Sequence, residues 1–334
     1  MATRLAINGF GRIGRAAFKI ALEQDEVVEV VAINDLGEPE NLAYLLRYDT
    51  IYGRYSKDIA VNQDKLVVGG KEIKVFAEKD PKALPWGDLK IDVVIEATGV
   101  FTDRESATAH LVAGAKKVII SAPTKDNDVA TVVLGVNDKD LQGQTIISNA
   151  SCTTNCITPV AAVIESAFGI EKALLTTAHA YTATQALVDS PGKKDFRGGR
   201  AGAANMVPAS TGAAVAATQA LPSLEGKFDG IAVRVPLPIV SLSDFTFLLK
   251  REVTVDEVNQ VLTEAVDNPL YRGVLAVTKE PVVSSDFIGD PHSAIVDLQM
   301  TRVVGGNLVK VLAWYDNEWG YSNRLVEQVI ELGK

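Results

Sequence analysis

Sulfur and imidazole are scarce in this sequence. Its 334 residues include two cysteines, four positions apart, and three histidines. Cysteines at that spacing can lie on successive turns of one helix, where a disulfide would constrain little. A disulfide framework is therefore excluded, and reduced thiols are expected.

Long apolar runs and an excess of positive charge are also missing. No apolar run approaches the ~18 residues that a membrane-spanning helix needs. The 33 basic residues are outnumbered by 42 acidic ones, which gives a formal net charge of −9. A protein whose main partner is a nucleic acid carries a basic footprint, so this balance argues against that role. A local basic pocket for a small anion remains compatible with it.

The start of the chain lacks the charged segment followed by an apolar one that marks a secretory signal. Residues 4–8 instead form a short apolar strand pattern, and we expect a cytoplasmic protein. Hydrophobic residues at 47% and charged residues at 22% are typical of soluble globular proteins. Because 334 residues exceed the size at which one core usually keeps growing, two domains are expected.

Strand and helix patterns alternate in the first part of the chain. Apolar strand patterns cover residues 4–8, 27–33, 91–98, 117–121, 131–135 and 145–148, and helical patterns cover 12–23 and 104–113. Alternation of this kind predicts a parallel sheet with helices on both faces.

The second part has a different character. A helix is expected over residues 151–168, and residues 180–205 form a long irregular stretch, which is unusual unless it is functional or lies at an interface. Strands then predominate, at 174–177, 230–235, 243–249, 273–277, 295–297 and 308–314, with helices at 255–266 and 320–332. We therefore expect an α+β second domain.

A glycine-rich turn follows the first strand. Residues 9–14 read G-F-G-R-I-G and fit G-x-G-x-x-G between a strand and a helix, where a pyrophosphate can approach the backbone. Asp35 follows Gly14 by 21 residues, where a carboxylate accepts hydrogen bonds from a ribose. The alternative is a plain strand–turn–helix with a solvated Asp35. Because apolar Leu36 follows this acid, NAD is favoured over NADP.

The segment A-S-C-T-T-N-C at residues 150–156 contains both cysteines. Cys152 lies among hydroxyl side chains at an expected helix start, where backbone N–H groups and the macrodipole lower a thiol pKa, so it is a candidate nucleophile. Cys156 is expected to be a small buried hydrophobe.

A cysteine nucleophile needs a base or an imidazolium partner. His179 follows an expected strand just before the irregular stretch, where site residues tend to lie. His110 lies inside an amphipathic helix and is expected to be a surface or packing residue, and no role is assigned to His292. The residues alone leave the pairing of His179 with Cys152 open.

Hydroxyl and guanidinium groups near these positions are candidates for binding anions. Arg197 and Arg200 could equally be solvated charges on a loop. Arg234 interrupts the apolar run I-A-V-R-V-P, so it lies either at a solvated sheet edge or in a site.

The order of the motifs resembles phosphorylating glyceraldehyde-3-phosphate dehydrogenases of the bacterial glycolytic type. It comprises G-F-G-R-I-G, A-S-C-T-T-N-C, H-A-Y-T, G-A-A-N-M-V-P-A-S-T-G-A-A, R-V-P and W-Y-D-N-E-W-G-Y, over essentially the whole chain. The resemblance implies a Rossmann domain with a parallel sheet over residues 1–150 and 317–334. It also implies an α+β catalytic domain with a mainly antiparallel sheet over residues 151–316, NAD as cofactor, and a homotetramer in which the irregular stretch packs against a neighbour.

The resemblance also assigns residues to roles. Cys152 corresponds to the nucleophile and His179 to its activator. The attacking inorganic phosphate is assigned Ser151, Thr153, Thr211 and Gly212, and the substrate's own phosphate Thr182 and Arg234, with Arg197 shared. The cofactor is assigned Gly9, Gly11, Arg12, Ile13, Asp35, Lys79, Ser121, Asn317 and Tyr321. No residue is assigned to a metal. Lys79 departs from the family, which usually has Arg there, and a contact through its main chain would leave the assignment intact.

The activity that this resemblance implies is the oxidation of glyceraldehyde 3-phosphate through a thiohemiacetal and a thioester on Cys152. Phosphate then releases 1,3-bisphosphoglycerate. The alternatives are an erythrose-4-phosphate dehydrogenase, a semialdehyde dehydrogenase, and a non-catalytic NAD-binding interaction protein.

Overall fold

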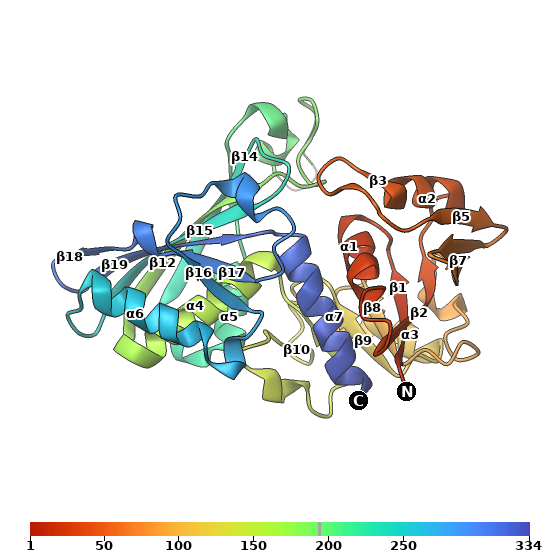
Figure 1. Ribbon diagram of the computed structural model, residues 1–334, viewed down its shortest axis with the longest axis horizontal. Helices are drawn as coiled ribbons and strands as arrows, with labels where there is room; N and C mark the ends of the chain where they lie inside the picture. Colours follow the sequence, from red (N-terminus) through yellow and green to blue (C-terminus); the bar gives the residue numbers. More distant parts are fainter. Residues whose placement is uncertain (193–194) are drawn as a thin grey trace. The chain divides into compact units, whose positions relative to one another are not determined.

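The computed structural model describes residues 1–192 and 195–334, and the chain divides into two compact units (Figure 1). The first unit comprises Met1–Val132, Asp138–Ala150 and Ser322–Lys334, and the second comprises Val133–Asn137 and Ser151–Tyr321. No helix in the described ranges is both long enough and apolar enough to cross a lipid bilayer.

The first unit is built on a mostly parallel sheet with the strand order β10-β11-β9-β8-β1-β2-β7-β6-β5. Its parallel strands are β1 (Thr3–Asn8), β2 (Val28–Asn34), β7 (Lys71–Phe76), β8 (Val93–Glu96), β9 (Lys117–Ile120), β10 (Ala130–Thr131) and β11 (Ile146–Ser148). The antiparallel strands β5 (Ile59–Asn62) and β6 (Lys65–Val68) extend one edge. The chain order reverses between β1 and β8, and such a reversal places a crevice at the carboxyl ends of the strands.

Helices α1 (Arg12–Ala21), α2 (Pro39–Arg47) and α3 (Arg104–Val112) belong to the same unit, as does the ribbon of β3 (Tyr48–Asp49) and β4 (Gly53–Arg54). Helix α3 begins with a capping box, because the Asp103 carboxylate accepts the N–H of Ser106 at 2.8 Å. Helix α7 (Trp319–Gly333) contributes its residues from Ser322 onward.

The strand predicted over residues 131–135 is wrong beyond its first residue. Val132 still donates to Ser148 O at 2.9 Å, but the Asn137 side chain then accepts the N–H of Val133 at 2.8 Å, and Gly135 has φ +85°. This turn bends the chain away from the sheet, and residues 133–137 belong to the second unit.

The second unit contains a mainly antiparallel sheet in the order β13-β14-β12-β15-β19-β17-β16, with β18 (Arg302–Val304) beside β19. The strands are β12 (Ile170–Ala180), β13 (Val207–Ser210), β14 (Phe228–Val235), β15 (Ser241–Leu249), β16 (Leu275–Thr278), β17 (Ala294–Asp297) and β19 (Leu308–Tyr315). Two neighbouring pairs, β12 with β14 and β16 with β17, run parallel.

Helices α4 (Cys152–Phe168), α5 (Ala213–Ala220) and α6 (Val255–Val266) lie along one side of this sheet (Figure 1). Burial alternates along β12, so that Leu175, Thr177 and His179 are buried while Leu174 is 65% exposed. The apolar side chains on the buried face pack with those of α4 in one core. His179 therefore lies on the face that the helices cover, which is also where the first residue of α4 lies.

Candidate active site

Cys152 and His179 are in direct contact within the second unit. The Sγ atom of Cys152 lies 3.4 Å from Nε2 of His179. Cys152 is the first residue of α4, and the Ser151 hydroxyl caps this helix by accepting the N–H of Thr154 at 3.1 Å. The preceding Ala150 has φ +54°, a left-handed conformation that is uncommon for a residue other than glycine.

The charge state of this pair depends on burial as well as on its neighbours. Burial raises the pKa of the Cys152 thiol, against the opposing effect of the Arg234 charge. Burial and the same Arg234 charge lower the pKa of His179 to about 3. The backbone N–H groups of Cys152 and Thr153 at the helix start do lower the thiol pKa, but burial outweighs them, so the predicted net lowering is wrong for Cys152 taken by itself. The two groups titrate as a pair, because moving one proton from Sγ to Nε2 creates two opposite charges in contact.

The hydrogen bonds of His179 determine which nitrogen can act as a base. Its Nδ1 lies 2.7 Å from the carbonyl oxygen of Ala180, which only accepts, and 2.5 Å from Nη1 of Arg234, which only donates. Nε2 faces the thiol, and in the tautomer in which Nδ1 donates to Ala180 O, Nε2 has the lone pair that can take the thiol proton. This arrangement suits transfer of the thiol proton to His179.

Arg234 lies beside His179 because the two residues are register partners in the parallel pair of β12 and β14. Its Nη1 is 2.5 Å from Nδ1 of His179 and donates to Ala180 O at 3.2 Å. Its Nε is a buried donor without an acceptor among the described residues. A guanidinium with an unmatched donor next to a nucleophile fits an anionic group of a substrate. Of the two alternatives for Arg234, the structure supports the position in a site.

Tyr315 connects the start of α4 to the sheet, a role that the sequence patterns did not reveal. Its hydroxyl lies 2.9 Å from the Thr153 hydroxyl and 3.0 Å from the Thr177 hydroxyl. The Tyr315 ring also packs edge-to-face on the His179 ring at 6.1 Å. Ser151 thus caps the helix and Thr153 anchors it to the sheet, in addition to the phosphate contacts that the resemblance implies for both residues.

Four further residues assigned to phosphate groups are on the segment between β12 and β14. The Thr211 hydroxyl accepts the N–H of Ala213 at 3.1 Å, and the exposed Gly212 is the N-cap residue of α5. Thr182 is hydrogen-bonded within its own loop, at 2.9 Å to the Thr184 hydroxyl. Arg197 is an exposed residue of a short 3₁₀ turn.

The loop also contains Arg200, which pairs with Asp189 at 3.0 Å, both side chains being exposed. This geometry matches the alternative of a solvated charge for Arg200. Cys156 is fully buried in the core next to the Ser243 hydroxyl, as expected for a small hydrophobe.

The Ser241 hydroxyl connects Asn317 by hydrogen bonds to the strand that contains His179. The Ser241 hydroxyl accepts the N–H of Ala180 at 3.1 Å and donates to Oδ1 of Asn317 at the same distance. The side chain of Asn317 is 5% exposed, and Tyr321 is a buried residue in the first turn of α7. Ser241, like Tyr315, lies outside the motifs that sequence reasoning singled out as functional.

The three glycines of the G-x-G-x-x-G turn in the first unit have three different environments. Gly9 has φ +93°, and a Cβ there would lie 2.7 Å from the carbonyl carbon of Ala97. A Cβ on Gly14 would lie 2.0 Å from Gly9 O, whereas one on Gly11 would meet nothing within 4 Å. The turn, the close helix–strand packing and the open approach to the backbone are what a pyrophosphate-binding turn requires. Gly11 is the N-cap residue of α1 and leaves the helix start without a side-chain cap.

Asp35 connects the end of β2 to this turn. Its carboxylate accepts the N–H of Phe10 at 2.7 Å and that of Gly37 at 2.9 Å. The carboxylate lies along a cavity of about 480 Å³ at the carboxyl ends of the strands, which is also lined by Gly9, Gly11, Lys79, Thr98 and Phe101. Thr98 and Phe101 were not predicted, although their position after β8, at the reversal of strand order, is a signal that could have found them.

The remaining cofactor candidates lie elsewhere in the structure. Arg12 and Ile13 are in the first turn of α1, and the Arg12 side chain pairs with Asp49 at 2.5 Å. Ser121 follows β9, donates its N–H to Glu96 O at 2.9 Å and is not among the residues that line the cavity. Within the described ranges, no cluster of three or more His, Cys, Asp or Glu side chains could hold a metal ion.

Two family models match this sequence. One, described as "Glyceraldehyde 3-phosphate dehydrogenase, NAD binding domain", matches residues 3–104, and the other, "Glyceraldehyde 3-phosphate dehydrogenase, C-terminal domain", matches residues 151–317. The whole chain is 51% identical to glyceraldehyde-3-phosphate dehydrogenase 2 of Streptomyces avermitilis and to glyceraldehyde-3-phosphate dehydrogenase of Streptomyces coelicolor, with 99% of each covered. Over 98% of its length it is also 51% identical to glyceraldehyde-3-phosphate dehydrogenase of Geobacillus stearothermophilus, of which 97% is covered.

Proposed function

The chain belongs to the glyceraldehyde-3-phosphate dehydrogenase family, and on that premise we propose that it oxidises glyceraldehyde 3-phosphate with NAD and inorganic phosphate to 1,3-bisphosphoglycerate. The observation that carries this proposal is the 3.4 Å contact between Cys152 Sγ and His179 Nε2 beside the unmatched donor of Arg234. An intact pair of this kind favours an enzyme over a non-catalytic NAD-binding protein.

The proposed mechanism begins with Cys152. His179 Nε2 takes the thiol proton as Sγ attacks the aldehyde carbon, and it returns that proton to the carbonyl oxygen to give a thiohemiacetal. NAD, when bound, supplies the hydride acceptor. His179 holds the hydroxyl proton as the thiohemiacetal becomes a thioester on Cys152. An oxygen of inorganic phosphate then displaces Sγ, which recovers its proton, and the acyl phosphate leaves.

Two groups of residues are assigned to the phosphates. Ser151, Thr153, Thr211 and Gly212 hold the attacking phosphate, Thr182 and Arg234 hold the phosphate of the substrate, and Arg197 serves both. The buried Nε of Arg234 supports its assignment, as does the N-cap position of Gly212 for an anion at the start of α5.

NAD is the cofactor, and the glycine-rich turn and Asp35 of the first unit fit it. We assign its pyrophosphate to Gly9, Gly11, Arg12 and Ile13, its adenosine ribose to Asp35 and its nicotinamide to Asn317 with Tyr321 nearby. Lys79 and Ser121 complete the assignment. The open space at Gly11 and the tight packing at Gly14 support it. We assign cofactor binding to residues 1–150 and 317–334 and the chemistry to residues 151–316. The grouping of Met1–Val132 and Asp138–Ala150 with Ser322–Lys334 supports this division, whereas residues 133–137 and 317–321 group with the second unit.

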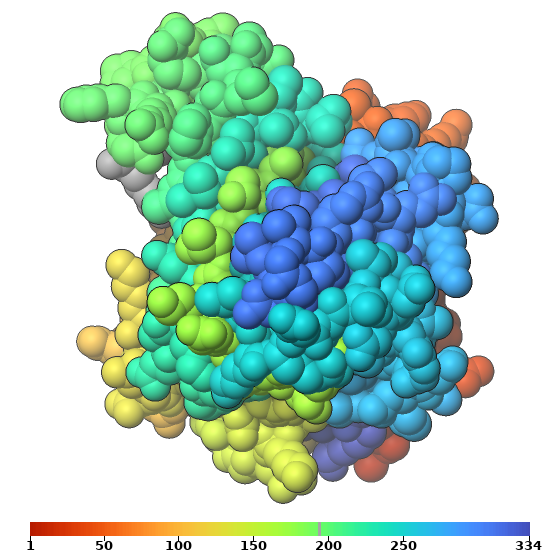
Figure 2. Space-filling view, turned by 90° about the vertical axis from the view of Figure 1, so that its left-hand side faces the viewer, coloured from red at the N-terminus to blue at the C-terminus, as the bar shows by residue number. Residues whose placement is uncertain are grey.

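The proposal includes a cytoplasmic homotetramer. On the sheet face opposite the helices, Leu174 is 65% and Ile231 is 53% exposed, and exposed apolar surface of this kind marks interaction sites. Residues 181–192 and 195–206, green in Figure 2, stand out from the second unit, and their Leu187 and Phe196 are 86% and 95% exposed. Both surfaces fit burial against further copies of the chain.

A phosphate-free burst tests the chemistry. Enzyme mixed with NAD and glyceraldehyde 3-phosphate in the absence of phosphate and arsenate should release about one NADH per active site and then stop, because the thioester accumulates. Cys152→Ser should abolish the burst and retain NAD binding, whereas the matched Cys156→Ser should retain both. Steady turnover without phosphate would refute the thioester scheme.

Rates with erythrose 4-phosphate and glyceraldehyde 3-phosphate on the same preparation decide between the two aldehydes. A higher kcat/KM for the four-carbon sugar would overturn the substrate assignment.

A further inference from the structure

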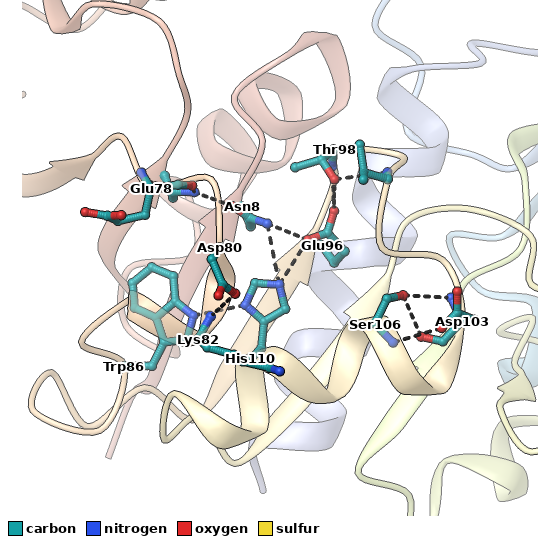
Figure 3. A network of polar contacts seen from close by, with 12 residues as sticks. Asn8, Glu78, Asp80, Lys82, Trp86, Glu96, Thr98, Asp103, Ser106 and His110 are labelled. Carbon is teal, nitrogen blue, oxygen red and sulfur yellow. Dashed lines mark hydrogen bonds and ion pairs between the residues drawn. The ribbon is translucent and has the colours of Figure 1, made fainter.

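A buried polar network that the proposed chemistry does not use adjoins the cavity of the first unit, which Asn8, Asn34 and Thr98 of the network line (Figure 3). Its central groups are the Glu96 carboxylate and the His110 ring, which are 1% and 0% exposed. Nε2 of His110 lies 3.0 Å from Oε2 of Glu96, and Nε1 of Trp86 donates to Nδ1 of His110 at 3.1 Å. Neither Glu96 nor Trp86 was singled out from the sequence, and His110 was assigned only to surface or packing.

Two hydrogen bonds of His110 have fixed directions, and its third contact, from Nε2 to Nδ2 of Asn8 at 3.5 Å, then joins two donors and adds no hydrogen bond. An indole N–H can only donate, so Nδ1 of His110 is the acceptor and Nε2 carries the ring proton. His110 therefore donates from Nε2 to the carboxylate of Glu96. The orientation of the ring is set by Trp86 on one side and Glu96 on the other.

The other end of the network is anchored by main-chain groups. The N–H of Glu78 donates to Oδ1 of Asn34 at 2.8 Å, and Nδ2 of Asn34 donates to Glu78 O at 2.9 Å. Nδ2 of Asn34 also donates to Oδ1 of Asn8 at 2.7 Å, so Nδ2 of Asn8 must face Glu96, to whose Oε2 it donates at 2.5 Å. The orientation of both amides follows from the backbone of Glu78.

These contacts reach the two walls of the cavity. On one wall, Glu78 and Lys79 line the cavity, and Asn34 holds the backbone of Glu78. On the other, Glu96 Oε1 accepts the N–H of Thr98 at 2.8 Å and also accepts the Thr98 hydroxyl. The Phe101 ring of the same wall packs edge-to-face on His110 at 6.3 Å. One unbroken set of oriented hydrogen bonds thus joins both walls of the cavity.

We propose that Glu96 and His110 are positioning residues for the adenosine half of NAD, because they hold the walls formed by residues 78–79 and 98–101 at a fixed separation. The proposal rests on the assignment of this cavity to NAD. A well-packed apolar cluster would stabilise the unit at least as well as a buried carboxylate–imidazole pair. What the network adds is direction: each of its members has a single orientation, and the positions of Thr98 and the Glu78 backbone follow from it.

Glu96→Gln and His110→Phe test the proposal with ADP-ribose as the probe. Glutamine has a single acceptor oxygen, so its amino group would face either the donors of Asn8 and His110 or the main-chain N–H of Thr98. Phenylalanine removes both hydrogen bonds of His110 but retains a ring against Phe101. The dissociation constant for ADP-ribose and the KM for NAD should each rise about three- to tenfold in both variants, with kcat at saturating NAD unchanged. The rate at which iodoacetamide alkylates Cys152 in the absence of cofactor should also be unchanged.

Three further variants distinguish positioning from general stability. His110→Gln can accept from Trp86 and donate to Glu96, so it should restore much of the affinity. Val118→Ala removes buried volume from β9 without touching the network, and it should lower the melting temperature and leave ADP-ribose affinity unchanged. Asp35→Asn changes the cavity itself and should weaken ADP-ribose binding.

The outcomes separate the two hypotheses. Wild-type affinity in folded Glu96→Gln and His110→Phe, with weakened binding in Asp35→Asn, would overturn the positioning role alone. The positioning role also fails if Val118→Ala weakens binding as much as Glu96→Gln. Unchanged affinity in Asp35→Asn as well would overturn the assignment of the cavity and, with it, this proposal.

Discussion

At the residue scale, Arg234 has the largest electrostatic effect on the reacting pair. Its positive charge lowers the pKa of both the Cys152 thiol and the His179 imidazole. Protonation adds a positive charge to each group, and the nearby guanidinium disfavours that addition. Arg234 is also the residue assigned to the phosphate of the substrate. A bound phosphate would offset the guanidinium charge, so substrate binding and the protonation of the pair are linked.

Arg234→Gln should therefore shift the pH profile of Cys152 alkylation to higher pH, by about one unit. The shift is to higher pH because a neighbouring positive charge disfavours the protonated form of both groups. Removing that charge stabilises the protonated forms and raises both pKa values. The measurement is the rate of reaction with iodoacetamide as a function of pH. Arg200→Gln, which removes an exposed arginine paired with Asp189, should leave the profile unchanged. A shift to lower pH in Arg234→Gln would contradict this account of the pair.

At the element scale, the patterns predicted those segments whose two faces differ strongly. The helix expected over residues 255–266 coincides with α6 (Val255–Val266), where Thr254 and Glu257 form a capping box. Helix α5 (Ala213–Ala220) was not predicted, because A-A-V-A-A-T-Q-A has nearly the same small apolar character on every face and shows no helical periodicity. Strands β5, β6 and β7 were missed as well, because they are short and their exposed positions are charged or polar.

The candidate site was only partly predictable for a similar reason. The glycine-rich turn and the Cys152 helix start are local patterns, and they were found from the residues alone. Tyr315 lies 162 positions from Thr153 and 138 from Thr177, and no local pattern connects residues so distant. Their contact depends on the register of β12, β15 and β19, which the sequence periodicity does not determine.

Two glycines of the turn at the start of α1 provide a matched pair of variants. Gly14→Ala should push α1 away from β1, because the added Cβ would overlap Gly9 O, and it should destabilise the protein by about 1–3 kcal/mol. Gly11→Ala should leave stability nearly unchanged and still weaken NAD binding more than tenfold, because its Cβ would occupy the approach of the pyrophosphate. Thermal unfolding and titration with NAD measure the two effects. NAD affinity retained in Gly11→Ala would place the pyrophosphate elsewhere.

At the scale of the whole molecule, the second unit has one sheet face covered by its own helices and one that is not. The covered face holds the core and the reacting pair, and the other presents apolar side chains at Leu174 and Ile231. Assembly into the proposed tetramer would bury this surface without disturbing the face on which Cys152 and His179 lie.

The double substitution Leu174→Asp with Ile231→Asp should therefore dissociate the tetramer, because it places like charges on the sheet face that copies of the chain would share. Sedimentation velocity at fixed protein concentration measures the change in mass. Val27→Asp replaces an exposed apolar residue of the first unit and serves as the control. An unaltered mass in the double variant would exclude this face from the interface.

The parallel pairing of β12 with β14 in a mainly antiparallel sheet has a consequence for how such an enzyme can evolve. Parallel neighbours cannot be joined by a tight hairpin and need a crossover of a dozen or more residues. The connection that leaves β12 at Ala180 and reaches β14 at Phe228 meets that geometric demand, and it includes Thr182, Arg197, Thr211 and Gly212. If these residues bind the phosphates as proposed, insertions or deletions in this crossover would change which phosphorylated aldehyde is accepted, while the strand register would keep His179 opposite Arg234.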